Sequence, residues 1–222
     1  AFALDLGAND PVSNNLSRVE DALEAALRLR AQLSRKTVAD RQRASVADGL
    51  RLAVTDPLTG LYNRRYALPH LARIAARARQ TGRQFAVMVL DVDRFKTVND
   101  TWGHAAGDGV LQEIAARLVA NLREVDLVAR VGGEEFLVAM PETTLDAART
   151  TAERLCRAVH QNPVRLADGV TKISVTVSIG LAMSGGGLQE QLVEWVVDEA
   201  DRALLGSKAE GRNQVKISAS AA

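Results

Sequence analysis

The fold is decided by one stretch, Leu127-Val-Ala-Arg-Val-Gly-Gly-Glu-Glu-Phe-Leu-Val-Ala-Met140. Two apolar runs flank Gly132-Gly133, and this arrangement predicts a β-hairpin with a two-residue turn, because glycine accepts positive φ at no steric cost. Glu134 and Glu135 follow the turn directly. Adjacent strand residues point to opposite faces of a sheet, so we expect the two carboxylates to have different roles. A surface turn with solvated charges is the simpler alternative for this stretch taken alone.

A second apolar run, Phe85-Ala-Val-Met-Val-Leu-Asp91, has no polar face. This pattern predicts a central strand that is covered on both sides. The run ends in Asp91-Val92-Asp93, where the two aspartates share a face by the strand period of two. Carboxylates at the end of a buried strand open into a cleft and often bind a metal. The alternative is a pair of solvated charges at a strand end.

Residues 94–109 contain three glycines and several polar side chains, which predicts loops shaped for a ligand. Asn99 and Asp108 together could read guanine, because a carboxylate accepts from its two N–H donors and an amide can serve either side. Helices are predicted on either side, over 67–80 and 110–122.

Three later segments have simple interpretations when each is taken alone. Arg123-Glu-Val-Asp126 predicts a surface ion pair of little energetic value. Residues 173–179 alternate apolar and hydroxyl side chains, as in a half-exposed strand, and 215–217 predict a closing edge strand. Lys208-Ala-Glu-Gly-Arg212 predicts a helix end whose two cations either complement the helix dipole or bind phosphates.

The N-terminal part of the chain predicts a long helix over residues 16–54, with a narrow apolar stripe and charged residues elsewhere. That pattern favours a coiled-coil-like stalk over a helix packed on its own domain. Asp56-Pro57 ends the helix, and Asp56 and Asn63 can bond local backbone and fix the angle of the next helix. Residues 1–15 resemble the last part of a response-regulator receiver domain.

Composition excludes several classes of protein. Lys+Arg is 28 and Asp+Glu is 27, a net charge of +1, so no nucleic-acid partner is expected. No apolar run reaches the roughly 18 residues that span a bilayer, so no membrane association is expected. Cys156 is the single cysteine, which excludes a disulfide within the chain. We therefore expect a cytoplasmic protein.

Taken together, these motifs resemble GGDEF domains, the diguanylate cyclases, with glutamate at the variable position. The resemblance covers roughly residues 55–218. The chain looks like a response regulator of the PleD type truncated inside its last receiver domain, with a receiver remnant at 1–15, a stalk at 16–54 and a GGDEF domain at 55–222. The matching segments are Asp56-Pro-Leu-Thr-Gly-Leu-Tyr-Asn-Arg-Arg65, Asp91-Val-Asp-Arg-Phe-Lys96, Asn99-Asp-Thr-Trp-Gly-His104, Gly107-Asp108, Gly132-Gly-Glu-Glu-Phe136, Ser178-Ile-Gly180 and Lys208-Ala-Glu-Gly-Arg-Asn213.

The resemblance implies an α/β fold like the palm of polymerases and class III nucleotide cyclases, with a central mixed sheet flanked by helices and preceded by the stalk. It implies condensation of two GTP into cyclic di-GMP with release of two pyrophosphates. Because each domain of this kind holds one GTP, it also implies a homodimer. Mg²⁺ is the expected cofactor, with Mn²⁺ as a substitute.

The resemblance also implies roles for individual residues. The metal would be held by Asp91, the carbonyl of Val92 and Glu134. The catalytic group would comprise Glu134, Glu135 and Lys96. GTP would be bound by Phe95, Lys96, Asn99, Asp108, Gly132, Gly133, Lys208 and Arg212. Cyclic di-GMP would inhibit the enzyme at a product site formed by Arg123, Asp126 and Arg154.

Three alternatives stay open from the sequence. The first is a catalytically inactive module that binds GTP or cyclic di-GMP. The second is a cyclase that makes another dinucleotide, against which Asp108 argues because it suits guanine. The third is a purely structural dimerisation module, against which the hairpin carboxylates Glu134 and Glu135 argue.

Overall fold

A computed structural model describes residues 53–166, 169–185 and 193–219, together with the single residues Arg30, Lys36 and Gly49, which are helical and exposed. Contacts divide the chain into one unit of residues 1–51 and a second of residues 52–222. The predicted receiver remnant and nearly all of the predicted stalk lie outside the described residues, so both stay predictions.

The second unit is built on a six-stranded mixed sheet with the strand order β1-β3-β4-β2-β7-β8. The pairs β2–β4, β2–β7 and β3–β4 are antiparallel, whereas β1–β3 and β7–β8 are parallel. The predicted central mixed sheet is therefore confirmed. The strands are β1 Tyr62–Asn63, β2 Phe85–Val92, β3 Leu127–Arg130, β4 Glu135–Pro141, β7 Val177–Met183 and β8 Val215–Ile217, while β5 Val164–Arg165 pairs separately with β6 Lys172–Ile173.

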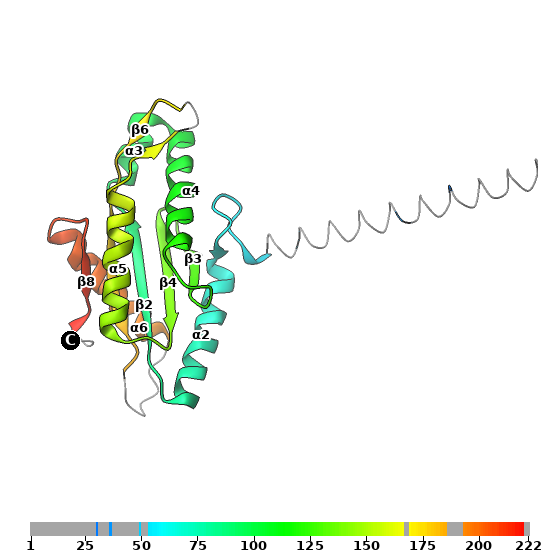
Figure 1. Cartoon of the computed structure of the whole chain (residues 1–222), viewed down its shortest axis with the longest axis vertical. Helices are drawn as coiled ribbons and strands as arrows, with labels where there is room; N and C mark the ends of the chain where they lie inside the picture. The colour runs from blue at the N-terminus through cyan, green and yellow to red at the C-terminus, as the bar shows by residue number, and fades with distance from the viewer. Residues whose placement is uncertain are drawn as a thin grey trace, which may run out of the picture. The chain divides into compact units, whose positions relative to one another are not determined.

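Helices cover both faces of the sheet (Figure 1), and β2 is buried along its whole length, as its apolar sequence predicted. Residues such as Met88 and Leu90 pack in one core cluster with α3, α4 and α5. The alternate residues, such as Val87 and Val89, pack in a second cluster with α2 and α6. The helices are α2 Arg64–Thr81, α3 Phe95–Trp102, α4 His104–Ala120, α5 Leu145–His160 and α6 Val193–Ala209.

The loops predicted over residues 94–109 are wrong, because α3 and the start of α4 occupy this segment. Gly103 alone breaks the helix, with a φ of 81°. Gly107 lies inside α4, where an added Cβ would come within 2.0 Å of the Asn99 Oδ1 atom. The glycine there allows α3 and α4 to pack closely and does not mark a loop.

The half-exposed strand predicted over residues 173–179 is also wrong in part. The structure ends β6 at Ile173, begins β7 at Val177 and buries Ser178 completely. The hydroxyl groups of Thr176 and Ser178 donate hydrogen bonds to the Asp93 carboxylate, so they do not face solvent. The predicted edge strand at 215–217 is confirmed as β8. No helix in the described part of the chain is long and apolar enough to cross a membrane.

Gly180 sets how closely α6 can approach the sheet. It lies in β7, and an added Cβ would come within 2.0 Å of the Ala200 carbonyl oxygen and 2.3 Å of the Leu204 nitrogen on α6. Both obstacles are backbone atoms, which cannot move aside alone. The close approach of β7 to α6 therefore requires glycine at this position.

We predict that Gly180→Ala lowers the free energy of unfolding by about 1–3 kcal/mol through overpacking. Gly109→Ala is the matched control. Gly109 lies inside α4, and an added Cβ there would make an ordinary contact with Leu166 at 3.7 Å. The control should gain about 0.5–1 kcal/mol from the helical preference of alanine. Urea unfolding measures both, and a Gly180→Ala chain as stable as the parent would contradict the packing argument.

Candidate active site

The hairpin loop between β3 and β4 closes over the end of β2. In the register of β2 with β4, Asp91 lies opposite Glu135. Beyond that pair, the Val92 N–H donates to the Glu134 carbonyl at 3.2 Å. The two carboxylate residues of the hairpin therefore lie next to the strand end that carries Asp91.

The predicted hairpin is confirmed, but its two-residue turn is wrong. The last β3–β4 pair is Arg130 with Phe136, and β4 begins at Glu135, so the loop between the strands spans residues 131–134. Neither glycine has the positive φ of a tight turn, because the longer loop does not need it. Gly132 instead makes room for Glu135, whose Oε2 atom would lie 2.3 Å from an added Cβ. An added Cβ at Gly133 would meet nothing within 4 Å.

Three carboxylates and one ammonium group gather at this point. Asp91 is only 7% exposed, and its Oδ2 atom lies 2.7 Å from the Lys208 Nζ atom of α6. Partial burial raises the pKa of Glu134, and the nearby Asp91 and Glu135 carboxylates raise it further, while Lys208 opposes them. The carboxylates therefore repel one another and favour a neutralising cation.

The donor atoms of this cluster fit a magnesium ion that arrives with a nucleotide. Among residues 53–166, 169–185 and 193–219, no three His, Cys, Asp or Glu side chains form a metal site. The available donors are the Asp91 and Glu134 carboxylates and the Val92 carbonyl, which are all hard oxygen ligands. Mg²⁺ is usually bound by one or two carboxylates plus substrate phosphates and water, and not by a complete protein cage.

Asp93 differs from Asp91 although both side chains reach toward α6. Asp93 is 7% exposed, and its oxygens accept hydrogen bonds from Thr176 Oγ1 at 2.6 Å, Ser178 Oγ at 2.7 Å and the Asn213 N–H at 3.0 Å. These donors occupy both carboxylate oxygens. The sequence predicted both aspartates at a metal cleft. Of the two, only Asp91 is close enough to Glu134 for its charge to raise the pKa of that carboxyl group.

The residues predicted to read guanine lie where α3 meets α4. Asn99 of α3 is half-buried, and its side chain reaches Gly107, the neighbour of Asp108. Asp108 is exposed near the beginning of α4. The structure thus brings these two predicted residues to one junction. Phe95 and Lys96 form the first turn of α3, which has no side-chain cap.

The two predicted phosphate-binding cations lie at and just beyond the end of α6, which confirms the predicted helix end. Lys208 is in the last turn, paired with Asp91. Arg212 is exposed in the turn that follows, where its N–H donates to the Ser207 carbonyl at 3.0 Å.

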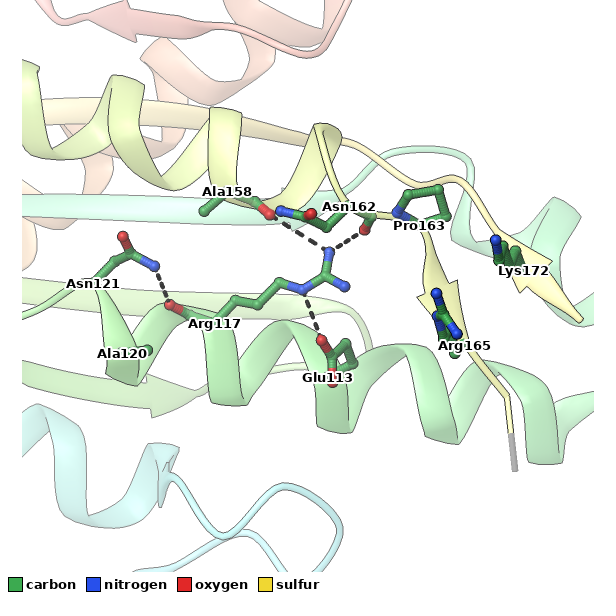
Figure 2. Close-up of a pocket in the computed structure, with 9 residues that line it drawn as sticks. All are labelled: Glu113, Arg117, Ala120, Asn121, Ala158, Asn162, Pro163, Arg165 and Lys172. Carbon is green, nitrogen blue, oxygen red and sulfur yellow. Dashed lines mark hydrogen bonds and ion pairs between the residues drawn. The ribbon is translucent and has the colours of Figure 1, made fainter. Parts of the chain in front are cut away.

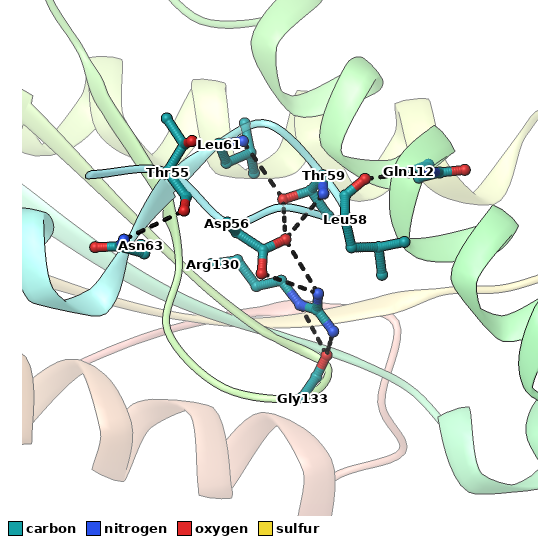
Figure 3. A network of polar contacts seen from close by, with 9 residues as sticks. All are labelled: Thr55, Asp56, Leu58, Thr59, Leu61, Asn63, Gln112, Arg130 and Gly133. Carbon is teal, nitrogen blue, oxygen red and sulfur yellow. Dashed lines mark hydrogen bonds and ion pairs between the residues drawn. The ribbon is translucent and has the colours of Figure 1, made fainter. Parts of the chain in front are cut away.

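Arg130 is a residue that the sequence analysis missed (Figure 3). Its guanidinium donates to the Gly133 carbonyl, from Nε at 3.1 Å and from Nη2 at 2.7 Å. Its Nη1 atom donates to Asp56 Oδ1 at 3.1 Å. Arg130 therefore ties the hairpin loop to the turn at Asp56. A charged residue in an otherwise apolar strand, two positions before Gly132, was the signal that could have revealed it.

The turn on the other side of Arg130 is itself well bonded, as the sequence predicted for Asp56 and Asn63. Asp56 accepts from the Thr59 N–H at 2.9 Å and hydroxyl at 2.7 Å. Burial would raise the pKa of Asp56, but the hydrogen bonds from Thr59 and Arg130 outweigh it and lower the pKa below its ordinary value. The Asn63 amide donates to the Ala53 and Thr55 carbonyls, while its oxygen accepts from the Tyr66 N–H at the start of α2.

Arg123 and Asp126 form the ion pair that their spacing predicted, but it is not a surface pair, because Asp126 is buried. The Arg123 Nη2 atom lies 2.7 Å from Asp126 Oδ1, and the Asp126 side chain is only 1% exposed while that of Arg123 is 50% exposed. Arg154 of α5 donates to the nearby Asn121 carbonyl at 2.7 Å. A cavity of about 590 Å³ lies beside Arg123, and its lining includes His70, Arg73, Arg77, Pro141 and Glu142.

Another cavity lies between α4 and α5 and contains none of the predicted site residues (Figure 2). Arg117 is bound there by the Glu113 carboxylate at 2.9 Å and by the Val159 carbonyl at 3.1 Å. Its role is to join the two helices. Arg165 and Lys172 lie opposite each other at the β5–β6 edge of this cavity.

Comparison with known proteins places this site in a family. The family described as "Diguanylate cyclase, GGDEF domain" matches residues 53–214. The chain is 42% identical over 213 residues to response regulator PleD of Caulobacter vibrioides, which covers 96% of this chain and 46% of PleD. It is 36% identical over 204 residues to diguanylate cyclase DgcP of Pseudomonas aeruginosa, which covers 90% of this chain and 30% of DgcP. The chain thus spans less than half the length of these two relatives.

A solved structure supports the same assignment. The crystal structure of the coiled coil and GGDEF domain of DgcB from Caulobacter crescentus, in complex with c-di-GMP, aligns with a TM-score of 0.74 at 33% identity. The alignment covers 86% of this chain and 99% of that chain. The chain is thus an α/β domain whose mixed sheet is flanked by helices, and its fold matches that of a GGDEF domain. The chain belongs to the GGDEF family of diguanylate cyclases, which confirms the family resemblance found in the sequence.

We predict that Glu134→Gln raises the melting temperature at neutral pH in metal-free buffer. The pKa of Glu134 is raised in the folded state, so the folded parent loses stability as pH rises from the ordinary value of 4.5 through the raised one. Glutamine carries no charge and avoids this loss, so the difference should appear at pH 7.5 and shrink near pH 4.5. Thermal unfolding in EDTA at both pH values measures it.

Glu124→Gln is the matched control, because Glu124 is exposed and distant in sequence from Asp91. It should leave the melting temperature nearly unchanged at both pH values. A Glu134→Gln chain that melts at or below the parent temperature at pH 7.5 would show that the charge of Glu134 carries no cost in the folded protein.

Proposed function

We propose that this domain condenses two GTP into cyclic di-GMP with release of two pyrophosphates. The observation that supports the proposal most is the convergence of Asp91, Glu134 and Lys208 at the end of β2. Two carboxylates suit Mg²⁺, with Mn²⁺ as a substitute, and the ammonium group beside them suits the phosphates of a nucleoside triphosphate. Bound there by Asp91, the Val92 carbonyl and Glu134, the ion would supply Lewis-acid chemistry for the ribose 3′-hydroxyl and the leaving pyrophosphate.

The cations and one helix end of this chain would bind the triphosphate. Lys208 and Arg212 would hold the β- and γ-phosphates, and Arg212 is exposed and available for them. The backbone amides of Phe95 and Lys96 would add donors at the uncapped start of α3, where a helix favours anions. Lys96 and Glu135 would complete the catalytic group around Glu134.

Asn99 and Asp108 would select guanine. Asp108 is exposed at the junction of α3 and α4, where the Asn99 side chain reaches Gly107. Its carboxylate can therefore accept from the two guanine N–H donors. Gly132 and Gly133 would let the nucleotide approach the hairpin backbone. The open space above Gly133 supports this role, because an added Cβ there would meet no atom within 4 Å.

The stoichiometry of the reaction requires two domains. Each domain would hold one GTP, and the product contains two nucleotides, so two sites must face each other in a homodimer. The predicted stalk over residues 16–54 would raise the effective concentration of the second domain by tethering it. By likeness to PleD, the domain would serve as the output of a response regulator.

Arg123, Asp126 and Arg154 would form an inhibitory product site. Half of the Arg123 side chain is exposed although its partner Asp126 is buried, so the guanidinium can bind a second anion. The adjacent cavity carries further cations, Arg73 and Arg77. A guanine base and a phosphate are the groups that such arginines recognise.

Incubation with GTP and Mg²⁺, followed by chromatography of the products, tests the proposed reaction. The parent chain should form cyclic di-GMP, and its rate per molecule should rise with protein concentration because two domains must meet. Glu134→Gln should lower turnover at least ~100-fold, as expected for the loss of one preorganised electrostatic contact. Glu124→Gln should turn over normally. Binding without turnover in the parent would indicate an inactive binding module, and near-normal turnover of Glu134→Gln would remove Glu134 from the chemistry.

Arg123→Ala should leave the initial rate with GTP nearly unchanged but weaken inhibition by added cyclic di-GMP, because Arg123 lies apart from the hairpin loop. Initial rates measured across a series of product concentrations give the result. Arg149→Ala is the control, since Arg149 is an exposed arginine of α5 that pairs with Glu153. Unaltered product inhibition in Arg123→Ala would leave Arg123 and Asp126 as an ion pair with a structural role alone.

A further inference from the structure

Asp93 is a buried carboxylate that no cation neutralises in the described part of the chain. Its oxygens accept one backbone N–H, from Asn213, and two hydroxyl groups, from Thr176 and Ser178. A buried carboxylate is costly unless hydrogen bonds satisfy it. The Asn213 N–H can only donate, so its bond requires an acceptor at this position, and the charged carboxylate makes that bond charge-assisted.

The turn that Asp93 contacts has an unusual backbone. Gly211, Arg212 and Asn213 have φ values of 120°, 67° and 47°, three left-handed residues in succession. Positive φ is uncommon for a residue such as Arg212, although asparagine tolerates it better, and such strain gathers at functional sites. The surroundings must therefore hold Arg212 and Asn213 in place.

Two sets of hydrogen bonds hold this turn. On the α6 side, the Ser207 hydroxyl donates to the Gln214 carbonyl at 2.8 Å, and the Gln214 amide returns a bond to the Ser207 carbonyl at 2.9 Å. On the sheet side, the Asn213 N–H donates to Asp93 at 3.0 Å, and the Ile179 N–H donates to the Gln214 carbonyl at 3.0 Å. The Arg212 N–H itself donates to the Ser207 carbonyl at 3.0 Å, and the Asp93 bond holds the next residue, Asn213, from the sheet side.

One strand end therefore contacts both cationic positions. Asp91 pairs with the Lys208 side chain, and Asp93, two residues later, binds the backbone that carries Arg212. The Arg212 side chain itself stays exposed. A fixed backbone with a free guanidinium loses less conformational entropy when it binds a ligand.

We propose that Asp93 is a positioning residue that directs Arg212 toward the terminal phosphates of GTP. It acts through the Asn213 N–H and does not touch the nucleotide. The inference rests on the proposed function, because it takes GTP as the ligand of this site. Asparagine at position 93 is neutral and offers one acceptor oxygen in place of two, so the charge-assisted bond to the Asn213 N–H would be lost.

Binding of two nucleotides that cannot react tests the proposal. The ligands are 3′-deoxy-GTP, which lacks the attacking hydroxyl, and GMP, which lacks the terminal phosphates. Calorimetry with Mg²⁺ should show that Asp93→Asn weakens binding of 3′-deoxy-GTP about tenfold, the size expected for a lost charge-assisted contact. Binding of GMP should stay unchanged, because Arg212 does not reach it. A variant whose fold was disturbed in general would bind both 3′-deoxy-GTP and GMP more weakly.

A double-mutant cycle shows whether Asp93 acts through Arg212. Arg212→Ala should weaken 3′-deoxy-GTP binding by a similar factor, and Asp93→Asn combined with Arg212→Ala should weaken it no further. Asp198→Asn, an exposed aspartate of α6, is the matched control and should bind both nucleotides normally. Where Asp93→Asn does not fold, Ser178→Ala removes one donor from the same carboxylate and should give a smaller loss with 3′-deoxy-GTP alone.

Several results would overturn the inference. They are unchanged binding of 3′-deoxy-GTP in Asp93→Asn, an equal loss of GMP binding, or losses that add in the double variant. A parent chain that binds neither nucleotide would instead overturn the proposed function, and the inference with it. A parent that binds 3′-deoxy-GTP while Asp93→Asn and Ser178→Ala behave like it overturns the inference alone.

Discussion

The register between β2 and β4 is the constraint on which the site depends. It sets Asp91 opposite Glu135 and is held by buried pairs such as Leu90 with Phe136. Because side chains alternate between the faces of a sheet, a shift by one residue would move Asp91 away from α6 and Lys208. Core packing on both faces therefore fixes the position of the charges, and the apolar sequence of β2 serves the site as much as the fold.

Around the β2–β4 pairing, the fold holds together carboxylates that repel one another, those of Asp91, Glu134 and Glu135. Partial burial and the nearby Asp91 and Glu135 carboxylates together raise the pKa of Glu134, and this is a cost to stability that a ligand can relieve. Arg130 holds the hairpin loop from one side by joining the Gly133 carbonyl to Asp56. Asp93 holds the turn after α6 from the other. The site is thus assembled from the end of β2, the hairpin loop and the turn after α6. Hydrogen bonds hold the loop to Asp56 through Arg130 and hold the turn to Asp93.

Much of this arrangement could be predicted from the sequence, and the failures share a cause. The buried strand, the hairpin and the helix end at Lys208 depend on local patterns, which a sequence displays. The loop predicted over 94–109 was wrong because Gly107 serves packing against Asn99, and Ser178 was placed in solvent because its partner Asp93 lies 85 residues away. Arg130 was missed because Asp56 lies 74 residues away. Pairing over such distances needs the fold.

Binding of Mn²⁺ in the presence of 3′-deoxy-GTP, followed by electron paramagnetic resonance, tests most directly the claim that Asp91 and Glu134 form one metal–nucleotide site. The spectrum distinguishes protein-bound from free Mn²⁺ without any turnover. The account predicts bound Mn²⁺ in the parent chain and much weaker binding in both Asp91→Asn and Glu134→Gln. Equal binding of Mn²⁺ by all three proteins would contradict it.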